Sequence, residues 1–375
     1  MISILDKHNC CGCQACHEAC PARCITMVAD AEGFLYPEIQ AADCLECHRC
    51  EQVCPQLNPP RGTDERPLNC YAVQSKDTKT RLQSSSGGVF SLLAEAILKQ
   101  GGVVFGARFD DNCTVYHSFT ETMEGLSPFR GSKYAQSDMR KAYTQVGRFL
   151  QQKRPVLFTG TPCQIAGLRG YLQGKKDENL YLVSVVCHGV PSPKVWKTFL
   201  DNVTDGVPPT SVNMRDKENG WSRYKMVIRR DGKTLQDIPA TDTPFMRAFL
   251  SNQILRPACY SCRFRSNHGS DLTLGDYWGI EKYHPNMSDN KGTSLILAYT
   301  QKGQQLLAGL DLIREESRYE DAVRENPSII NASPEPAGRA SFWKAFQRRG
   351  ADALDIYTND SYKARIQRFW YRFRP

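Results

Sequence analysis

Two stretches near the amino terminus share one cysteine spacing: CCGCQACHEACP at residues 10–21 and CLECHRCEQVCP at residues 44–55. Both read Cys-x-x-Cys-x-x-Cys-x-x-x-Cys-Pro. This spacing is typical of bacterial-type proteins with two [4Fe–4S] clusters, in which three close cysteines bind one cluster and the fourth binds the other. It predicts a first cluster bound by Cys10, Cys13, Cys16 and Cys54, and a second bound by Cys44, Cys47, Cys50 and Cys20.

The alternatives for such a segment are a zinc site or a disulfide framework. Zinc takes four ligands, usually as two separated pairs, and eight cysteines at a doubled spacing fit that pattern poorly. The proline after each fourth cysteine fixes φ and removes a backbone donor, which helps the chain turn into a short helix. The segment therefore predicts an electron-transfer protein with iron–sulfur clusters.

The composition is that of a globular chain with two or three domains. The 375 residues are 41% hydrophobic, carry a formal net charge of +8 and include 16 cysteines. The amino terminus lacks the charged-then-apolar pattern of a signal peptide, and no run of about 18 uncharged apolar residues could span a membrane. Cysteines in this number without an export signal indicate reduced, metal-bound thiols, so we expect a cytoplasmic protein.

Much of the positive charge lies near the carboxyl end. There, basic and aromatic residues are interleaved: Lys363, Arg365, Arg368, Arg372 and Arg374 with Tyr362, Phe369, Trp370, Tyr371 and Phe373. Such a tail suits peripheral contact with an anionic membrane surface or an acidic partner. The alternative is a helix that packs its aromatic rings on the parent domain and keeps its charges in solvent. No motif for nucleic-acid binding accompanies the charge, so no nucleic-acid partner is expected.

The fold predicted is α+β and multi-domain. Residues 1–57 form the ferredoxin-like two-cluster domain, residues 58–68 a linker rich in proline and charge, residues 69–335 an α/β domain, and residues 336–375 a basic helical extension. Within the α/β domain, alternating apolar strands and helices place the functional site at the carboxyl ends of the strands. Expected strands are 70–73, 102–107, 155–160, 180–186, 224–229 and 294–299, and expected helices are 90–100 and 140–152.

Several loops at strand ends or helix starts hold candidate functional residues. Ser86, Gly87 and Gly88 precede a helix, where free backbone N–H groups suit a phosphate or a flavin edge; an ordinary helix cap gives the same pattern. Lys133 and Tyr134 place a cation beside an aromatic ring, although a loop lysine is more often merely solvated.

Four further cysteines lie in this second part of the chain. Cys163 and Cys187 follow two predicted strands, and Cys259 and Cys262 form a close pair. Together they suit a third [4Fe–4S] cluster, with a structural zinc or inert buried thiols as the alternatives. Cysteines not assigned to a cluster are Cys11, Cys24, Cys70 and Cys113.

Over residues 69–335 the chain resembles the beta-subunit family of deazaflavin (coenzyme F-420) hydrogenases and dehydrogenases, in the variant with a fused two-cluster ferredoxin. The resemblance is carried by SGG at 86–88, GSKY at 131–134, TGTPCQ at 159–164, CHG at 187–189, the cysteine pair at 259 and 262, and LGDYWG at 274–279. It implies FAD bound by the α/β domain and a [4Fe–4S] cluster beside it, with Cys163, Cys187, Cys259 and Cys262 as ligands. The candidate FAD contacts are Ser86, Gly87, Gly88, Lys133, Tyr134, Thr159, Gly160, Thr161 and Gln164.

The function expected is that of an iron–sulfur flavoprotein oxidoreductase. Electrons would pass between a ferredoxin-type carrier, three [4Fe–4S] clusters, FAD and a small organic substrate, because a flavin converts one-electron into two-electron chemistry. Some fused members of the family resemble proteins of cell-surface polysaccharide metabolism. The alternatives are a non-enzymatic electron-relay subunit of a larger redox complex and a deazaflavin oxidoreductase.

Three residues are candidates for a catalytic role: His188 and Asp276 as proton donors near the flavin, and Lys133 as a contact to flavin or substrate. His188 follows a predicted cluster ligand, so a hydrogen bond that supports the cluster is an equal alternative. An aspartate in such a loop, like Asp276, more often accepts hydrogen bonds within a turn.

Overall fold

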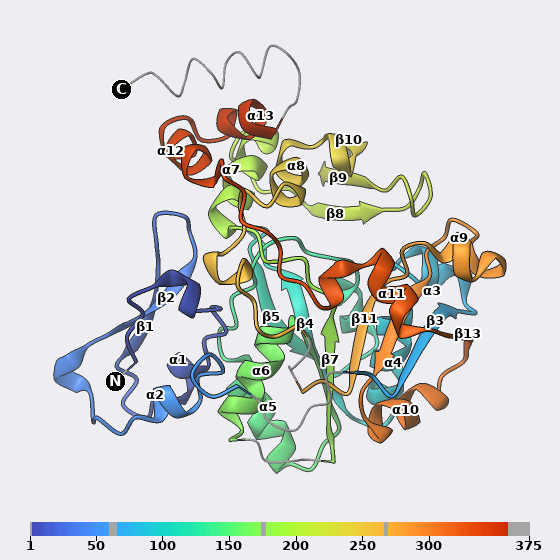
Figure 1. The fold of residues 1–375 in the computed structure, drawn as a ribbon, viewed down its shortest axis with the longest axis horizontal. Coiled ribbons are helices and arrows are strands. Elements are labelled where there is room, and N and C mark those ends of the chain that lie inside the picture. Colours follow the sequence, from blue (N-terminus) through green and yellow to red (C-terminus); the bar gives the residue numbers. More distant parts are fainter. Residues whose placement is uncertain (1, 60–65, 174–177, 266–268, 359–375) are drawn as a thin grey trace.

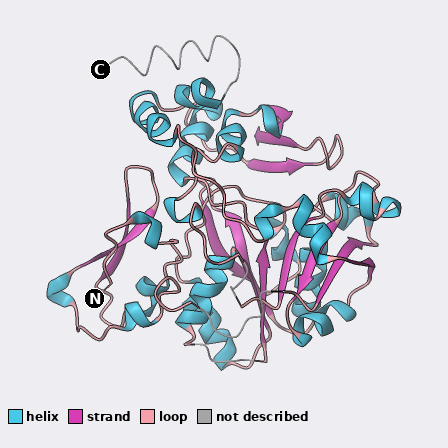
Figure 2. Ribbon diagram, in the orientation of Figure 1, coloured by secondary structure: helices cyan, strands magenta, loops and turns pink. Residues whose placement is uncertain are grey.

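The computed structural model describes residues 2–59, 66–173, 178–265 and 269–358 (Figure 1). The chain builds a small amino-terminal domain, a large sheet with helices on both faces, and a third unit in which helices pack on a short three-stranded sheet (Figure 2). The first domain lies beside helices α5 and α6 of the large sheet, and the third unit lies above the sheet in the view of Figure 1.

The amino-terminal domain repeats one short structural unit. Its elements are η1 (Lys7–Asn9), α1 (Ala15–Ala19), β1 (Ile25–Ala29), β2 (Leu35–Ile39), η2 (Ala41–Asp43) and α2 (Arg49–Gln52). Strand β1 pairs antiparallel with β2, so that Ile25 lies opposite Ile39. The core between them is very small, with Cys16, Cys24 and Cys50 among its buried members. A domain this small needs additional stabilisation, which bound metal can provide.

The large sheet has eight strands and is mixed. In spatial order its strands are β13 (Leu312–Ser317), β3 (Asn69–Ser75), β12 (Ser294–Ala298), β11 (Leu272–Asp276), β7 (Leu180–Val185), β6 (Val156–Gly160), β4 (Val103–Phe109) and β5 (Val115–Thr120). Four central neighbours, β4, β6, β7 and β11, run parallel, and the outer strands pair antiparallel. The carboxyl ends of β6, β7 and β11 therefore open at the same edge of the sheet.

Alternation along the central strands sends side chains to two separate cores. On one face Val104, Leu157 and Val183 pack under α4 (Val89–Lys99) and α10 (Gln301–Ala308). On the other face Phe105 and Phe158 pack under α5 (Ala142–Gln151) and α6 (Pro162–Tyr171), and this core continues into the amino-terminal domain. Burial on both faces explains the continuous apolar runs in these strands.

Shorter elements border this sheet: α3 (Thr78–Leu82), η3 (Glu124–Phe129), α9 (Ile280–Tyr283), η6 (Pro285–Met287), α11 (Tyr319–Glu325) and η7 (Pro327–Ile329). The third unit comprises α7 (Pro193–Thr204), β8 (Ser211–Asp216), β9 (Lys225–Arg230), β10 (Lys233–Pro239), η4 (Ala240–Asp242), α8 (Pro244–Leu250), α12 (Arg339–Arg349) and α13 (Asp352–Thr358). These share a core with Trp196, Phe245, Phe342 and Trp343. The helices expected after residue 335 thus pack against residues 193–250.

The mixed α/β sheet, the ferredoxin-type domain and all the strands and helices named from the sequence are present, with ends shifted by at most two residues. The basic and aromatic tail from residue 362 lies outside the described residues, as do positions 60–65 of the predicted linker. Among the helices that the structure describes, none combines the length and apolar character needed to cross a bilayer.

Candidate iron–sulfur sites and their surroundings

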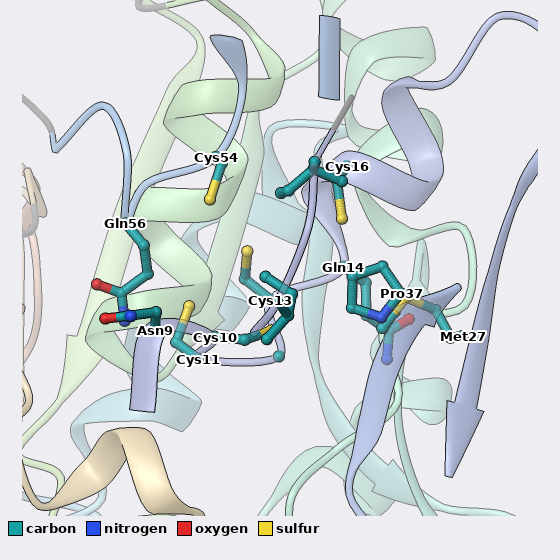
Figure 3. A pocket seen from close by; sticks show the side chains of 13 residues that line it. Asn9, Cys10, Cys11, Cys13, Gln14, Cys16, Met27, Pro37, Cys54 and Gln56 are labelled. Atoms are coloured by element: carbon teal, nitrogen blue, oxygen red, sulfur yellow. The ribbon is translucent and has the colours of Figure 1, made fainter. Parts of the chain in front are cut away.

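The four cysteines predicted for the first cluster surround one cavity of about 350 Å³. Figure 3 shows Cys10, Cys13, Cys16 and Cys54 arranged around this space, with Cys11 at its wall. Cys10 follows η1, Cys16 lies in α1, and Cys54 comes from the end of the second cysteine run. The predicted crossing of the fourth cysteine to the opposite cluster site is therefore compatible with the fold.

A second cavity of about 370 Å³ is lined by Cys20, Cys44, Cys47 and Cys50. Its remaining lining residues all belong to the amino-terminal domain. Cys47 is exposed, whereas Cys13 in the matching position of the first run is buried. Cys24 also lines this cavity, and its Sγ lies 3.5 Å from that of Cys20. The second site therefore faces solvent more than the first.

A third cavity, of about 420 Å³, lies at the carboxyl ends of β6 and β7 and is lined by Cys163, Cys187, Cys259 and Cys262. Cys163 lies in the first turn of α6, which begins with Pro162 and is capped by Gln164; the Gln164 Oε1 accepts a hydrogen bond from the Thr161 N–H at 2.9 Å. Cys259 ends the short helix η5 (Pro257–Cys259). Segments far apart in sequence thus bring these four thiols to one place, at the edge where the α/β pattern predicts a site.

Burial raises the pKa of the Cys187 thiol to about 12 and also raises that of Cys262. Such thiols become thiolate ligands only beside a strong positive charge, which a metal supplies. In the described part of the chain, no group of three or more His, Cys, Asp or Glu side chains is arranged to hold one metal ion. The cysteines instead line three hollows that are open to solvent on one side.

The first and third cavities are neighbours, because Cys11 lines both. Its thiol interacts with those of Cys13 and Cys163. Helix α6 permits this approach through two glycines. A Cβ on Gly167 would lie 2.8 Å from the Cβ of Cys13, and one on Gly170 would lie 2.3 Å from the carbonyl oxygen of Val53.

Two of the loops that hold predicted FAD contacts touch each other, and another reaches the third cavity. The Ser85 Oγ accepts a hydrogen bond from the Ser132 N–H at 2.8 Å, which joins the loop at 84–88 to the loop at 131–134. The Thr161 Oγ1 lies 3.2 Å from the Cys163 Sγ, so the loop after β6 reaches the third site. The motifs at 86–88 and 131–134 are therefore neighbours in space, and the motif at 159–164 lies at the third cavity.

Within these loops most of the predicted contacts also have structural roles. The Ser86 Oγ donates to the Thr293 carbonyl at 2.9 Å, and a Cβ on Gly87 would lie 2.3 Å from the Val73 carbonyl oxygen. Gly88 has φ +91 and precedes α4. Close packing and backbone conformation therefore already account for the two glycines. Thr159 also has a structural role, because its Oγ1 donates to the Phe105 carbonyl at 2.8 Å.

Lys133 donates to the carbonyls of Pro128 and Arg130, each at 2.8 Å, and no carboxylate among the described residues lies within 4.0 Å of its ammonium. Burial lowers the pKa of Lys133 to about 7. Nearby, the buried His117 bonds to Ser137 and to the Thr159 carbonyl, and burial lowers its pKa to about 4. The His117 ring is therefore neutral near pH 7.

Asp276 ends β11 and accepts hydrogen bonds from Arg215 Nη1 at 2.5 Å and from Trp221 Nε1 at 3.1 Å. Arg215 is buried, and its Nη1 also donates to the Tyr134 hydroxyl at 3.3 Å. Among the described residues, its Nε and Nη2 have no hydrogen-bond partner. The predicted residues Asp276 and Tyr134 are thus joined by a buried arginine with free donors.

His188 is engaged away from these loops. Its Nε2 lies 2.6 Å from the Asn252 Oδ1, and its ring packs edge-on against Phe249 at 5.0 Å. Burial lowers the pKa of His188. His188 thus contacts Asn252 and Phe249, and both of its expected roles stay predictions.

Sequence reasoning did not identify Cys11, Arg215 or Arg256 as part of these sites. Cys11 stands next to a predicted ligand, and Arg256 lies three residues before Cys259, so both had a local signal. Arg215 lies in β8 of the third unit and had none.

Comparisons with known proteins bear on both halves of the chain. Residues 9–57 match the family described as 4Fe-4S dicluster domain. Residues 153–317 match the family described as the C terminus of the beta subunit of coenzyme F420 hydrogenase/dehydrogenase. The resemblance expected from the sequence is confirmed by these two matches. The loops at 86–88 and 131–134 precede the second matched range, so their roles stay predictions.

Two similar proteins illustrate the range of relatives. A subunit of the F(420)H(2) dehydrogenase of Methanosarcina mazei is 21% identical over 292 residues, which are 72% of this chain and 76% of that protein. The chloroplastic 7-hydroxymethyl chlorophyll a reductase of Oryza sativa subsp. japonica is 23% identical over 175 residues, 47% of this chain and 35% of that protein. A chain in the structure of the F420-reducing [NiFe] hydrogenase complex from Methanosarcina barkeri aligns with a TM-score of 0.46 and 15% identity, covering 78% of this chain and 91% of that chain.

These relatives establish an iron–sulfur chain of oxidoreductase type. The third cluster, FAD, the link to a ferredoxin-type carrier and the role in polysaccharide metabolism stay predictions.

Proposed function

We propose that this chain, which joins a 4Fe-4S dicluster domain to the C-terminal region of the coenzyme F420 hydrogenase/dehydrogenase beta-subunit family, is the electron-relay subunit of a redox complex. The single observation that carries the proposal is the row of three four-cysteine cavities, of which the first and third share Cys11. With [4Fe–4S] clusters bound, such sites supply one-electron carriers. The proposed ligands are Cys10, Cys13, Cys16 and Cys54; Cys44, Cys47, Cys50 and Cys20; and Cys163, Cys187, Cys259 and Cys262.

The geometry favours one order of sites. Cys11 lines both the first and the third cavity, and Gly167 of α6 lets Cys13 approach closely, whereas no residue lines both the second cavity and the third. The second site also has the exposed Cys47 beside it, and the neighbouring Leu45 is 68% exposed. An external one-electron carrier would therefore approach the second site, and the third site would communicate with the loops at the sheet edge.

A partner protein would complete the reaction at that edge. The relative from Methanosarcina mazei is named as a subunit of an F(420)H(2) dehydrogenase, which supports a protein partner and a deazaflavin as the two-electron reactant. A ferredoxin-type protein is the carrier that fits the exposed second site, because small clusters exchange electrons through short surface contacts.

The test is the variant Cys259→Ala in anaerobically prepared protein. We expect it to lose about four irons per chain, the content of one cubane, while the amino-terminal signals persist. Electrons from dithionite or reduced ferredoxin should still reach the amino-terminal sites and no longer reach an acceptor at the sheet edge. Unchanged iron content and unchanged acceptor reduction in Cys259→Ala would remove the third site, and with it the relay.

A second function is favoured by the free donors of Arg215: FAD-dependent reduction or oxidation of a small organic substrate within this chain, with the deazaflavin as one such substrate. The buried Nε and Nη2 of Arg215 lie in the same network as Tyr134 and Asp276, and the uncompensated Lys133 lies in the adjoining loop. These groups suit the phosphates of a flavin. A bound flavin would turn single electrons into a hydride equivalent.

Flavin released on denaturation of the purified chain tests this second function. Lys133→Met should retain less flavin than wild type. In wild type, retention should weaken as the pH rises above about 7, because the Lys133 charge that attracts an anion is lost there. Absence of flavin from wild type in the presence of excess FAD would leave the relay as the sole function.

A further inference from the structure

Arg256 lies between the first and third sites and belongs to neither set of predicted ligands. It precedes Cys259 by three residues, and its side chain extends into the amino-terminal domain. The residue is only 1% exposed. An arginine placed so deeply needs hydrogen bonds for its five N–H groups and compensation for its charge.

The guanidinium meets the first cysteine run directly. Its Nε donates to the Cys10 carbonyl at 2.6 Å, and its Nη2 lies 3.4 Å from the Cys10 Sγ and 3.0 Å from the Leu35 carbonyl oxygen. Its Nη1 donates to the Gln136 Oε1 at 3.0 Å. All three nitrogens are therefore occupied, and one of them points at the sulfur of a proposed ligand.

No carboxylate within the described ranges lies within 4.0 Å of this guanidinium; the ion pairs of the molecule involve other arginines. The rings of Tyr36 and Phe34, at 4.2 Å and 5.5 Å, lie beside it instead. A buried cation with no acidic partner is costly. A cluster held by four thiolates carries net negative charge and would supply the missing compensation.

The backbone is shaped around this contact. Gly12 has φ +72, and a Cβ there would lie 2.6 Å from the Arg256 Nη1. Gln136 completes the enclosure, because its Nε2 donates to the Cys11 carbonyl at 3.0 Å while its Oε1 accepts from Arg256. The arginine is thus fixed between the loop of the first cysteine run and the segment that contains Gln136.

The second site has no equivalent. Within the described residues, no lysine or arginine side chain is hydrogen-bonded to the sulfur of Cys20, Cys44, Cys47 or Cys50, and the donor to the Cys44 Sγ is the Glu46 backbone N–H at 3.4 Å. The position that matches Gly12 is Glu46, which is exposed. The two cysteine runs therefore share a spacing and differ in charge around the sulfur atoms.

We propose that Arg256 is a positioning residue that raises the reduction potential of the first site above that of the second, so that an electron arriving at the second site is drawn inward. Hydrogen bonds and positive charge at ligating sulfur stabilise the more negative, reduced state. One electron is gained by the first site and lost by the second. No proton is exchanged, because arginine stays protonated. The inference rests on the proposed ligand sets.

The experiment compares Arg256→Gln with wild type by potentiometric EPR titration of the anaerobic full-length protein, with iron measured on the same samples. Signals are assigned by their loss in Cys50→Ala and Cys259→Ala. We expect the first-site potential to fall in Arg256→Gln by about 59 mV or more, a tenfold change in the ratio of reduced to oxidised sites. The second-site potential should not move.

Two further variants keep the test decisive. Gln136→Glu places a carboxylate beside the guanidinium without altering any cysteine or Arg256 itself, and should lower the first-site potential in the same direction. Arg263→Gln is the matched control, because the exposed Arg263 also donates from this loop to an amino-terminal carbonyl, that of Gln56 at 3.0 Å. Arg263→Gln should leave all potentials unchanged.

Unchanged first-site potentials in both Arg256→Gln and Gln136→Glu, with full iron content, would overturn the inference and leave the relay standing. Equal shifts at all three sites would also overturn it. If Arg256→Gln loses iron, the first-site potential of Gln136→Glu decides: a fall supports the inference and an unchanged value overturns it. Wild-type protein without amino-terminal clusters would instead refute the proposed function.

Discussion

The two cysteine runs have the same local backbone and different surroundings. Gly12 and Gln14 of the first run have φ of 72° and 64°, and the matching Glu46 and His48 have φ of 52° and 55°. Each run then enters a short helix. Yet the cysteines of the first run lie against α6 and Arg256, whereas the second run contacts α6 through Val53 near its end and has an exposed cysteine, Cys47. The cysteine spacing therefore determines the local backbone of each run. Tertiary contacts determine how exposed each site is and which charged groups lie near its sulfur atoms.

The largest effect should come from removing one ligand from each run. Cys13→Ala would remove a ligand of the first site that is also buried against α6, whereas Cys47→Ala would remove the matching ligand of the second site, which is exposed. Both variants should lose about four irons. Only Cys13→Ala should also lower the thermal midpoint of the large sheet.

Calorimetry with parallel iron analysis checks this contrast. Equal destabilisation by the two variants would show that the amino-terminal domain is energetically uniform, and the distinction between an inner and an outer site would fail.

The next effect concerns the docking of the amino-terminal domain on α6. In Gly170→Ala the new Cβ would lie 2.3 Å from the Val53 carbonyl oxygen, so backbone must move. We expect a loss of about 1–3 kcal/mol and faster proteolysis between residues 58 and 68. The control is Gly147→Ala on α5, where the nearest atom to a Cβ is 3.9 Å away.

Gly147→Ala should be neutral or slightly stabilising, because alanine is the better helix former. If both glycine variants behave alike in proteolysis and stability, α6 is not the surface that holds the amino-terminal domain.

The last effect, which vanishes at neutral pH, is a pH dependence of stability that comes from the buried His117. The folded-state pKa of His117 is lowered to about 4 from the ordinary 6.5, so its contribution to stability is present above pH 6.5 and is lost as the pH falls toward 4. His117→Gln should remove this part of the acid sensitivity, on the order of 3 kcal/mol at most. His48→Gln serves as control, since the exposed His48 bonds to Glu51 in the second run.

Thermal midpoints of the three proteins between pH 4.5 and 7 give the comparison. Parallel pH profiles for His117→Gln and wild type would mean that burial of His117 carries no proton-linked stability.

The sequence was informative where the signal was local. The doubled cysteine spacing predicted the amino-terminal domain, and alternating apolar runs predicted the central strands β4, β6 and β7. Strand β11 was not expected, because Leu272–Asp276 is short and ends in glycine and aspartate; it becomes a strand by pairing with β7 and β12. Likewise, nothing in the spacing of Cys11 indicated that it would lie between two cavities.

Contacts of charged residues that are far apart in the sequence could not be predicted from local sequence patterns either. Arg256 and Cys10 are 246 residues apart, and Arg215 and Asp276 are 61 residues apart. Such pairs depend on how the parts pack together. The cysteines that line the cavities were therefore predictable from the sequence. The arginines that place charge near them could be identified only from the folded structure.

The most direct measurement is the iron and acid-labile sulfide content of the anaerobically prepared wild-type chain. Three cubane sites predict about twelve irons and about twelve sulfides per chain. A content of about eight irons that does not fall in Cys259→Ala, or zinc in place of iron, would contradict the account.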